Sequence, residues 1–375
     1  MNSEKQGNGK KHRIISTIVL VIALILIIGY LGINLVFGER LRAAGSIRKI
    51  SDTLYTMEYK GDYGLDAYLL QGGGATSEEM ADYLTEFISN GLYKPEKNGI
   101  KNAPGCSTLS GKTADNTYLF GRNYDWQSGV TMVIHTKPQN GYESVSTTAL
   151  EFLGFGEDWR PEGFSNQMMA LAGIYIPMDG VNEKGLVIAD LMAGDREETH
   201  QTTAKADITT TVGIRLVLDH AASVDEVIAL LKNYDMNSDI GTTHHYAVSD
   251  PSGRSVVIEY IDGEMVVTET PVVTNHYLAA GHKHGIGSEQ SKERFQLLSE
   301  AVSEHNGHLS RDLVRDSLRA VSQGVMGDEY EVTRWSSVYD LEQASVDYYF
   351  GEDYSRAYCA VLGGDDIFAK WENVR

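Results

Sequence analysis

The chain has 375 residues, of which 42% are hydrophobic and 22% charged, and its formal net charge is −20. This composition is that of a globular protein, with room for one large domain or two ordinary ones, and it excludes wholesale disorder. Residues 1–40 hold five Lys or Arg and two Asp or Glu, so residues 41–375 carry a net −23, which repels nucleic acid and anionic lipid.

The first predicted element is residues 14–37, a run of 24 residues without a charge. A helix of this length measures about 36 Å and can cross a bilayer with some tilt. Four basic residues precede it: Lys5, Lys10, Lys11 and Arg13. They predict a cytoplasmic tail at 1–13, a single-pass anchor in the cell membrane at 14–37, and an extracellular remainder. A cleaved signal peptide is the alternative, but its apolar region is normally about 7–15 residues, and no clean small-x-small cleavage site follows this run.

Residues 38–105 are expected to form a separate region. A helical pattern runs from Ser77 to Ser89, with Ser77 or Thr76 as its N-cap, and Pro95 and Pro104 break structure after it.

Beyond this region the sequence predicts strands, helices, strands, helices and again strands. The expected strands are 116–121, 129–136, 173–177, 185–190, 246–250, 255–261, 264–269, 336–341, 345–350 and 357–362, and the expected helices are 211–220, 223–233, 290–305 and 310–321. The segment between 177 and 185 is expected to be a turn. This order predicts an α+β fold with two antiparallel sheets and helices outside them.

The chain has only two cysteines, which is weak evidence for a disulfide. Cys359 lies in an apolar, strand-like run and is predicted to be a buried small hydrophobe. Cys106 follows Pro104 and Gly105 in a turn-rich setting, which suits a reactive group better.

A thiol at Cys106 needs a base or a positive field, because the thiolate is the nucleophile. No histidine is near it in sequence, and no papain-type signature is present. The α-amine of Cys106 could itself accept a proton near neutral pH if the chain were cut between Gly105 and Cys106. Pro104 and Gly105 are a plausible place for that cut.

The pattern from Cys106 onward resembles the N-terminal nucleophile (Ntn) cysteine hydrolases, the group of choloylglycine hydrolases, penicillin V acylases and acid ceramidases that cleaves linear amides. Five short segments in the right order carry the resemblance: Cys106 with Arg122 and Asp125 in Gly121-Arg-Asn-Tyr-Asp-Trp126, then Asn182-Glu-Lys-Gly-Leu186, Thr274-Asn275, Ser291-Lys-Glu-Arg294-Phe295 and Thr333-Arg-Trp-Ser-Ser-Val-Tyr339. The resemblance implies a four-layer αββα sandwich over residues 106–375.

Roles follow from the resemblance. Cys106 would be the nucleophile and its α-amine the base, held by Asp125 through a charge-assisted hydrogen bond. Arg122 would favour the thiolate. Asn275, with help near Asn182, would donate to the oxyanion, and Arg294 would orient the amine or the substrate.

Simpler interpretations stand beside these roles. Arg122 and Asp125 could form an ordinary ion pair, Asn182 could be a turn residue, and Asn275 could be a cap. A histidine cluster, His276, His282 and His284, invites a metal site. No carboxylate or cysteine at ligand spacing supports that site, so no cofactor is expected.

The 105 residues before Cys106 depart from the bile-salt hydrolases, which begin essentially at the cysteine. In this the chain resembles acid ceramidase, whose pro-segment is cut autocatalytically and stays attached, so residues 38–105 are expected to be a pro-segment. The expected activity is hydrolysis of a linear amide, such as an N-acyl amine, an N-acyl amino acid or a conjugated bile-salt-like substrate. An acyltransferase on the same scaffold and an inactive surface-binding module are the alternatives.

Overall fold

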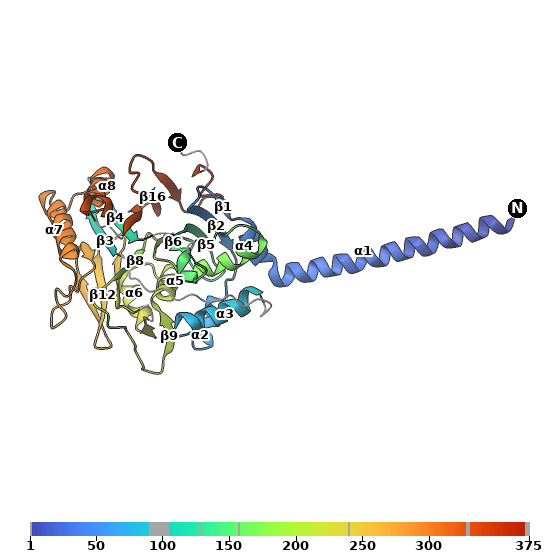
Figure 1. Ribbon diagram of the computed structural model, residues 1–375, viewed down its shortest axis with the longest axis horizontal. Coiled ribbons are helices and arrows are strands. Elements are labelled where there is room, and N and C mark those ends of the chain that lie inside the picture. The colour runs from blue at the N-terminus through green and yellow to red at the C-terminus, as the bar shows by residue number, and fades with distance from the viewer. Residues whose placement is uncertain are drawn as a thin grey trace.

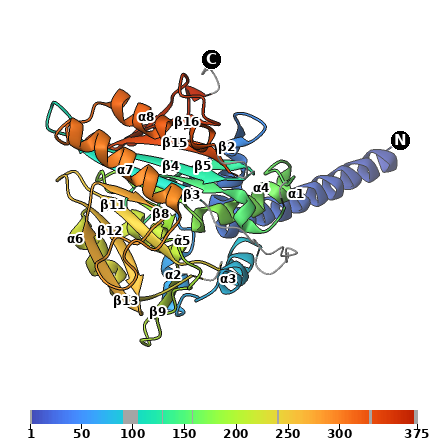
Figure 2. The same ribbon diagram turned by 60° about the vertical axis from the view of Figure 1, so that its left-hand side comes forward.

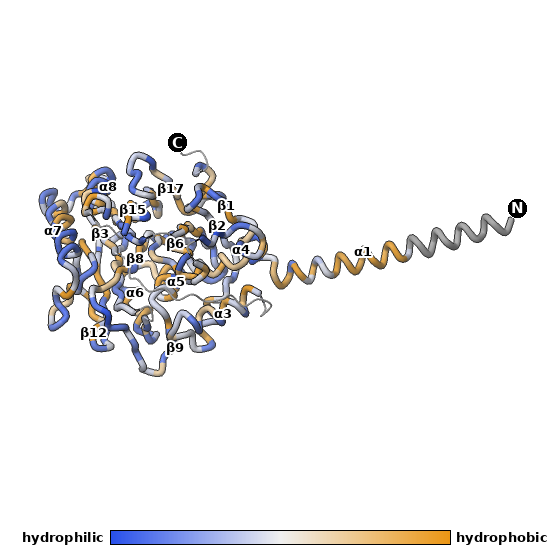
Figure 3. Tube along the Cα trace, viewed as in Figure 1, coloured by the Kyte–Doolittle hydropathy of each residue, from blue (hydrophilic) through white to orange (hydrophobic). Residues whose placement is uncertain are grey.

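The computed structural model describes residues 2–89, 105–127, 129–156, 158–238, 241–327 and 331–371 (Figure 1). The predicted breaks at Pro95 and Pro104 lie outside these ranges. Helix α1 (Asn2–Gly45) projects from the body of the protein (Figure 3), and its large apolar side chains between Ile18 and Val36 are exposed. Within the described residues one helix is long and apolar enough to cross a membrane, at Thr17–Gly45, where an 18-residue window has a mean hydropathy of 2.8, although a signal sequence near the N-terminus has the same properties.

One sheet has nine strands. Their order across the sheet is β1 (Arg48–Lys49), β2 (Leu54–Lys60), β5 (Thr131–Lys137), β6 (Ser144–Ala149), β7 (Asp179–Asn182), β8 (Val187–Met192), β11 (His244–Ser249), β12 (Ser255–Ile261) and β13 (Glu264–Glu269). Neighbours are antiparallel except β2 and β5, which run parallel. The parallel pair joins a strand from before Cys106 to one from after it.

The second sheet has six antiparallel strands. Their order is β14 (Val272–Thr274), β3 (Gly105–Lys112), β4 (Tyr118–Trp126), β15 (Val332–Asp340), β16 (Ser345–Phe350) and β17 (Tyr358–Val361). A small parallel pair, β9 (Ala206–Thr209) and β10 (Tyr234–Asn237), lies apart from both sheets. Cys106 is therefore the second residue of a strand with a hydrogen-bonded neighbour on each side.

The two sheets pack face to face. The apolar cluster between them includes Phe120 and Tyr124 from one sheet and Val133 and Val145 from the other. Helices α5 (Thr210–His220) and α6 (Val224–Leu231) cover the outer face of the nine-stranded sheet, and α7 (Glu289–Glu304) and α8 (Arg311–Ala320) cover that of the six-stranded sheet (Figure 2). The layers run helix, sheet, sheet, helix.

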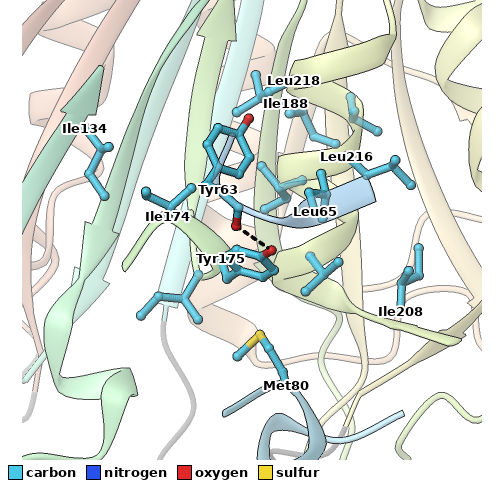
Figure 4. Packing of buried hydrophobic residues seen from close by; sticks show 14 of the residues in the cluster. Tyr63, Leu65, Met80, Ile134, Ile174, Tyr175, Ile188, Ile208, Leu216 and Leu218 are labelled. Atoms are coloured by element: carbon cyan, nitrogen blue, oxygen red, sulfur yellow. Dashed lines mark hydrogen bonds between the residues drawn. The ribbon is translucent and has the colours of Figure 1, made fainter. Parts of the chain in front are cut away.

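The segment before Cys106 is built into this body rather than forming the separate region that its composition suggested. Its helices α2 (Leu65–Leu70) and α3 (Ser77–Ser89) pack under the nine-stranded sheet with α4 (Phe164–Ala170) and two short 3₁₀ turns, η1 (Leu150–Leu153) and η2 (Leu171–Tyr175). Tyr63, Leu65 and Met80 lie in one apolar cluster with residues such as Ile188 and Leu218 (Figure 4).

Polar bonds reinforce that packing. Tyr175 donates its hydroxyl proton to the carbonyl oxygen of Tyr63 over 2.9 Å, and the Tyr63 hydroxyl bonds to the buried carboxylate of Asp219. Arg215 pairs with the same carboxylate at 2.7 Å. Because Tyr63 lies before Cys106 and the other residues lie after it, these bonds tie the two parts of the chain together.

Most predicted elements are present, and three local predictions are wrong. The expected strand at 173–177 is the 3₁₀ turn η2, because periodicity cannot tell a short apolar run in a strand from a buried helical turn. The expected turn contains strand β7 (Asp179–Asn182). Cys359 is exposed, because β17 is an edge strand whose alternate residues face solvent, while its neighbour Ala360 is buried.

Candidate active site

Cys106 lies in strand β3 with its side chain fully buried. Its main-chain N–H donates to Oδ1 of Asn275 over 2.7 Å, and Nη2 of Arg122 donates to its Sγ over 3.4 Å. Polar partners therefore contact the sulfur and the backbone nitrogen of the same residue. The sulfur and the backbone nitrogen are the two atoms that an N-terminal nucleophile uses.

Arg122 is placed by strand pairing. In the β3–β4 register Cys106 lies opposite Tyr124 and Thr108 opposite Arg122, so the side chains at 106, 122 and 124 share the face toward the other sheet. The buried guanidinium reaches Asp179 on β7 across the interface, with 2.6 Å between Nε and Oδ2. Asp179 also accepts from Trp335 Nε1 and the Tyr339 hydroxyl, both at 2.8 Å. These bonds hold Arg122 against the sulfur.

Asp125 lies on the opposite face of β4, toward α7. Its Oδ2 accepts from Arg294 Nη1 at 2.8 Å and Gln323 Nε2 at 3.1 Å, and its Oδ1 accepts from the Thr333 hydroxyl at 2.7 Å. Arg294 also donates to the carbonyl oxygen of Cys106 at 3.2 Å and to Asn275 Oδ1 at 2.9 Å. Arg294 thus connects the carboxylate, the amide and the main chain of the cysteine.

Asn275 follows strand β14 and its side chain bridges two elements. Its Oδ1 faces Cys106 and Arg294, whereas its Nδ2 donates to the carbonyl oxygen of Met192 at the end of β8 over 3.0 Å. The second hydrogen of this amide has no recorded partner among the described residues. It could donate to an oxyanion formed at the sulfur.

Burial controls protonation at the site. It raises the pKa of the Cys106 thiol to about 12, with a smaller opposing effect from Arg122, so the thiol of the uncut chain is protonated at neutral pH. Burial also raises the pKa of Asp125, against the favourable contacts of Arg294, Thr333 and Gln323. Any attack by the sulfur therefore requires a proton transfer.

The structure brings five of the six predicted catalytic residues together: Cys106, Arg122, Asp125, Asn275 and Arg294. Asn182 does not join them. Its Nδ2 donates to the carbonyls of Leu218 and Ala221, at 3.0 and 2.8 Å, and its Oδ1 accepts from the backbone of the following turn. Asn182 therefore fastens β7 to the end of α5, which corrects its predicted place beside the cysteine.

Strand parity explains this correction. Positions 179 and 181 of β7 face the sheet interface, where Val181 lies in the inter-sheet cluster, while 180 and 182 face α5. Asp179, three residues before Asn182 on the same strand, makes the contact with Arg122. Assigning this segment to a strand instead of a turn would have revealed that.

Gln323, at the start of α9 (Gln323–Met326), is a second residue that the sequence analysis missed. It is fully buried and donates to Asp125, and nothing in its sequence surroundings marks it. Thr333 is buried too, and it lay within a segment already singled out by resemblance.

The histidine cluster does not form a metal site. Over the described part of the chain no group of three or more His, Cys, Asp or Glu side chains could hold a metal ion. His276 instead shares contacts of 3.1 and 3.0 Å with Thr274 and Ser291. It supports the loop that carries Asn275.

Comparison with known proteins is consistent with this geometry. The sequence profile of the family described as linear amide C-N hydrolases, choloylglycine hydrolase family, matches residues 106–277, beginning on Cys106. Residues 106–277, just under half of the chain, therefore match this family. The residues before Cys106 and those after Tyr277 lie outside the profile.

Two curated relatives support the assignment. The penicillin V acylase of Pectobacterium atrosepticum is 35% identical over 106 residues, which are 25% of this chain and 28% of the relative. The bile salt hydrolase/transferase of Clostridium perfringens is 30% identical over 225 residues, which are 53% of this chain and 63% of the relative. The matched regions thus span less than two thirds of either relative's length.

Solved structures share the fold of most of this chain. A Cys-to-Ala mutant of the conjugated bile acid hydrolase from Clostridium perfringens aligns with a TM-score of 0.52 at 19% identity, covering 70% of this chain and 94% of that one. The penicillin V acylase from Agrobacterium tumefaciens aligns at 0.50 and 18%, covering 71% and 89%. At these identities the likeness concerns the fold alone.

Proposed function

We propose that the protein is a membrane-anchored amidase that cleaves linear amides through a thioester on Cys106. The α-amine of Cys106, freed by cleavage after Gly105, serves as the general base. Asp125 and Arg294 orient that amine, Arg122 stabilises the developing thiolate, and Asn275 donates to the oxyanion. Each role needs the residue within hydrogen-bond reach of the sulfur or the nitrogen, or of a group already bound there.

The single observation that carries the proposal is the double recognition of Cys106. A structural cysteine needs only apolar packing, yet here Arg122 contacts the sulfur while Asn275 and Arg294 contact the main-chain nitrogen and carbonyl oxygen of the same residue. Such an arrangement is useful where the nitrogen takes part in chemistry. The match of the family profile from Cys106 onward is independent support.

Cleavage would leave the segment before Cys106 in place. Strand β2 is hydrogen-bonded to β5, and Met57, Tyr63 and Leu65 are buried in the apolar cluster under the nine-stranded sheet. Losing them would expose that core to water, which is strongly unfavourable. Residues 38–105 therefore remain bound to residues 106–375 as a separate subunit after cleavage.

The helix at 14–37 acts as an anchor and not as a removed signal. Helix α1 continues without a break to Gly45, and its end is part of the folded body: Ala43 and Ala44 are buried, and Glu39 accepts from the main-chain N–H of Asp62 at 2.9 Å. A signal peptide is cut from an extended, accessible segment. The basic residues before the helix place the N-terminus in the cytoplasm and the enzyme outside.

The substrate class is an acylated amine or amino acid. Relatives named for penicillin V and for bile salts point to amides with a bulky acyl group, and a membrane tether suits a lipid-like one. Transfer of the acyl group to an amine is the second candidate, because one relative is named a hydrolase/transferase. Water and an amine would compete for the same thioester.

One experiment tests these points together. The full-length protein is recovered from membranes in detergent, its fragments are sequenced from their N-termini, and its release of acid from penicillin V and a glycine-conjugated bile salt is measured with and without added amines. We expect a fragment beginning at Cys106, acid release, and a single uncut, inactive chain for Cys106→Ala. An uncut but active wild-type protein would refute the self-cleavage, and a cut protein without acid or amide products would favour the binding module.

A further inference from the structure

Gly105, the residue before the proposed cleavage point, is closely surrounded by polar groups. It lies in strand β3, buried, opposite Asp125 of β4. A Cβ added to it would collide with Oε2 of Glu331 and lie 3.1 Å from Nε2 of Gln323 and 3.2 Å from Cβ of Asp125. A carboxylate oxygen therefore occupies the space where a side chain would begin, so a larger residue at position 105 would require the Glu331 carboxylate to move.

Glu331 and Asp125 are connected through one amide. Gln323 Nε2 donates to Asp125 Oδ2 at 3.1 Å and to Glu331 Oε2 at 3.4 Å, and the Gln323 side chain is fully buried. Because the amide is fixed by burial, it holds the Glu331 carboxylate against the Cα of Gly105. That Cα is one bond from the carbonyl carbon that Cys106 would attack.

The two carboxylates differ in their surroundings. Asp125 is buried and bonded to Arg294, Thr333 and Gln323, so its oxygens are occupied. Glu331 is half-buried, so part of this residue is in contact with solvent, whereas Cys106 is fully buried. Of the two, Glu331 has the access to solvent that a hydrolytic step requires.

We propose that Glu331 is a catalytic residue of self-processing: it is the general base for the water that hydrolyses the thioester between Gly105 and Cys106, and Gln323 positions it. The proposal deepens the proposed function, since it rests on self-cleavage, and adds a residue that acts on the chain itself and not on the amide substrate.

Self-cleavage by this route needs no co-reactant other than water. Sγ of Cys106 attacks the Gly105 carbonyl carbon, the C–S bond forms, the C–N bond breaks, and the thiol proton passes to the leaving α-nitrogen. Water then adds to the thioester carbon while Glu331 accepts one of its protons. The C–S bond breaks, the sulfur takes up a proton in turn, and Gly105 is left with a carboxyl group that ionises.

The test uses full-length protein in detergent and the Glu331→Gln variant, whose amide still fits beside Gln323. We expect its self-cleavage to slow by about 10²-fold or more, the usual contribution of a general base. Hydroxylamine needs no base to attack a thioester, so adding it should restore cleavage to near the wild-type rate and leave a hydroxamate on Gly105, read by mass spectrometry.

Glu352→Gln is the matched control. Oε1 of Glu352 accepts from the main-chain N–H of Gly324 at 2.9 Å and of Thr333 at 3.1 Å, so it holds the same loop without being among the groups nearest Gly105. Its self-cleavage should stay close to the wild-type rate without hydroxylamine.

The outcomes separate this inference from the proposed function. Wild-type protein that is never cut overturns self-cleavage and the role of Glu331 with it. Wild-type protein that is cut, with Glu331→Gln cut equally fast, overturns the role of Glu331 alone. A slow Glu331→Gln that hydroxylamine does not rescue also overturns it, because the variant then fails before the thioester forms.

Discussion

The chain before Cys106 is held in one way around Tyr63 and in another at Gly105. Residues around Tyr63 are fixed by broad apolar packing under the nine-stranded sheet, together with the Arg215–Asp219 ion pair. Gly105 and Cys106 are instead surrounded by a few side chains, each making specific polar contacts. Both regions bury an arginine completely, Arg215 in the first and Arg122 in the second.

Burial alone therefore does not distinguish a candidate catalytic arginine from a structural one. Among the described residues Arg215 donates to Asp219 and Ser144, whereas Arg122 contacts the Cys106 sulfur as well as a carboxylate. We therefore expect changes in the first region to alter stability and changes in the second to alter chemistry.

The largest effect should come from removing the first region. A chain that begins at Cys106 lacks β2, α2 and α3 and leaves the core beneath β5 open, so we predict that it does not fold. Circular dichroism and gel filtration check this. Deleting only residues 1–37 is the control and should give a folded, self-cleaving protein; a folded and active 106–375 fragment would contradict the prediction.

Arg122→Lys should lower kcat/KM for amide hydrolysis by about 10²–10³-fold, since a lysine cannot reach both Asp179 and the sulfur through one planar fork. Arg215→Lys is the matched control: we expect it to cost about 1–3 kcal/mol of unfolding free energy and to leave kcat/KM of the folded protein unchanged. Equal losses of activity in both variants would erase the distinction between the two regions.

A moderate, pH-dependent effect on folding stability is expected from His276, which supports the Asn275 loop. Burial, with help from His245 and Lys292, lowers its pKa to about 4, below the ordinary value near 6.5. As pH falls from about 6.5 toward 4, the unfolded chain binds the proton first, so the stability contributed by neutral His276 is lost over that window. Melting temperatures from pH 7.5 to 4.5 should fall less steeply for His276→Gln, and parallel slopes would refute this.

The smallest effect is expected at Cys359, on the exposed edge strand. Cys359→Ser should change the unfolding free energy by less than about 0.5 kcal/mol and leave hydrolysis unchanged. In the uncut Cys106→Ala protein a thiol probe should label Cys359, and labelling should vanish in the double variant. Slow labelling of native Cys359 would contradict the prediction, because it would show that the β17 edge is covered.

Local pattern predicted much of the fold. The helix at Ser77–Ser89 has the predicted bounds, with Thr76 accepting from Glu79 N–H at 3.1 Å, and the meander β11–β13 follows turn signals at Gly253 and Gly263. The insertion of β2 beside β5 was not predictable. A parallel pair between strands separated by about 70 residues leaves no short-range periodic signal.

The sequence alone was enough to name most residues of the candidate site. Cys106, Arg122, Asp125, Asn275 and Arg294 could be named because the segments that hold them resemble, in order, those of the Ntn cysteine hydrolases. The apolar helix at 14–37 could also be predicted from the sequence, because length and composition alone decide whether a segment can span a bilayer.

Which side chains meet could be seen only in the folded protein. Asp179 rather than Asn182 contacts Arg122, because successive residues of a strand face opposite sides and only one side faces the sheet interface. The fold also decides which residues surround Gly105. It also brought Gln323 and Glu331 to Gly105 across more than 200 residues of chain. Such encounters depend on how the sheets and helices stack, and no local pattern in the sequence records that stacking.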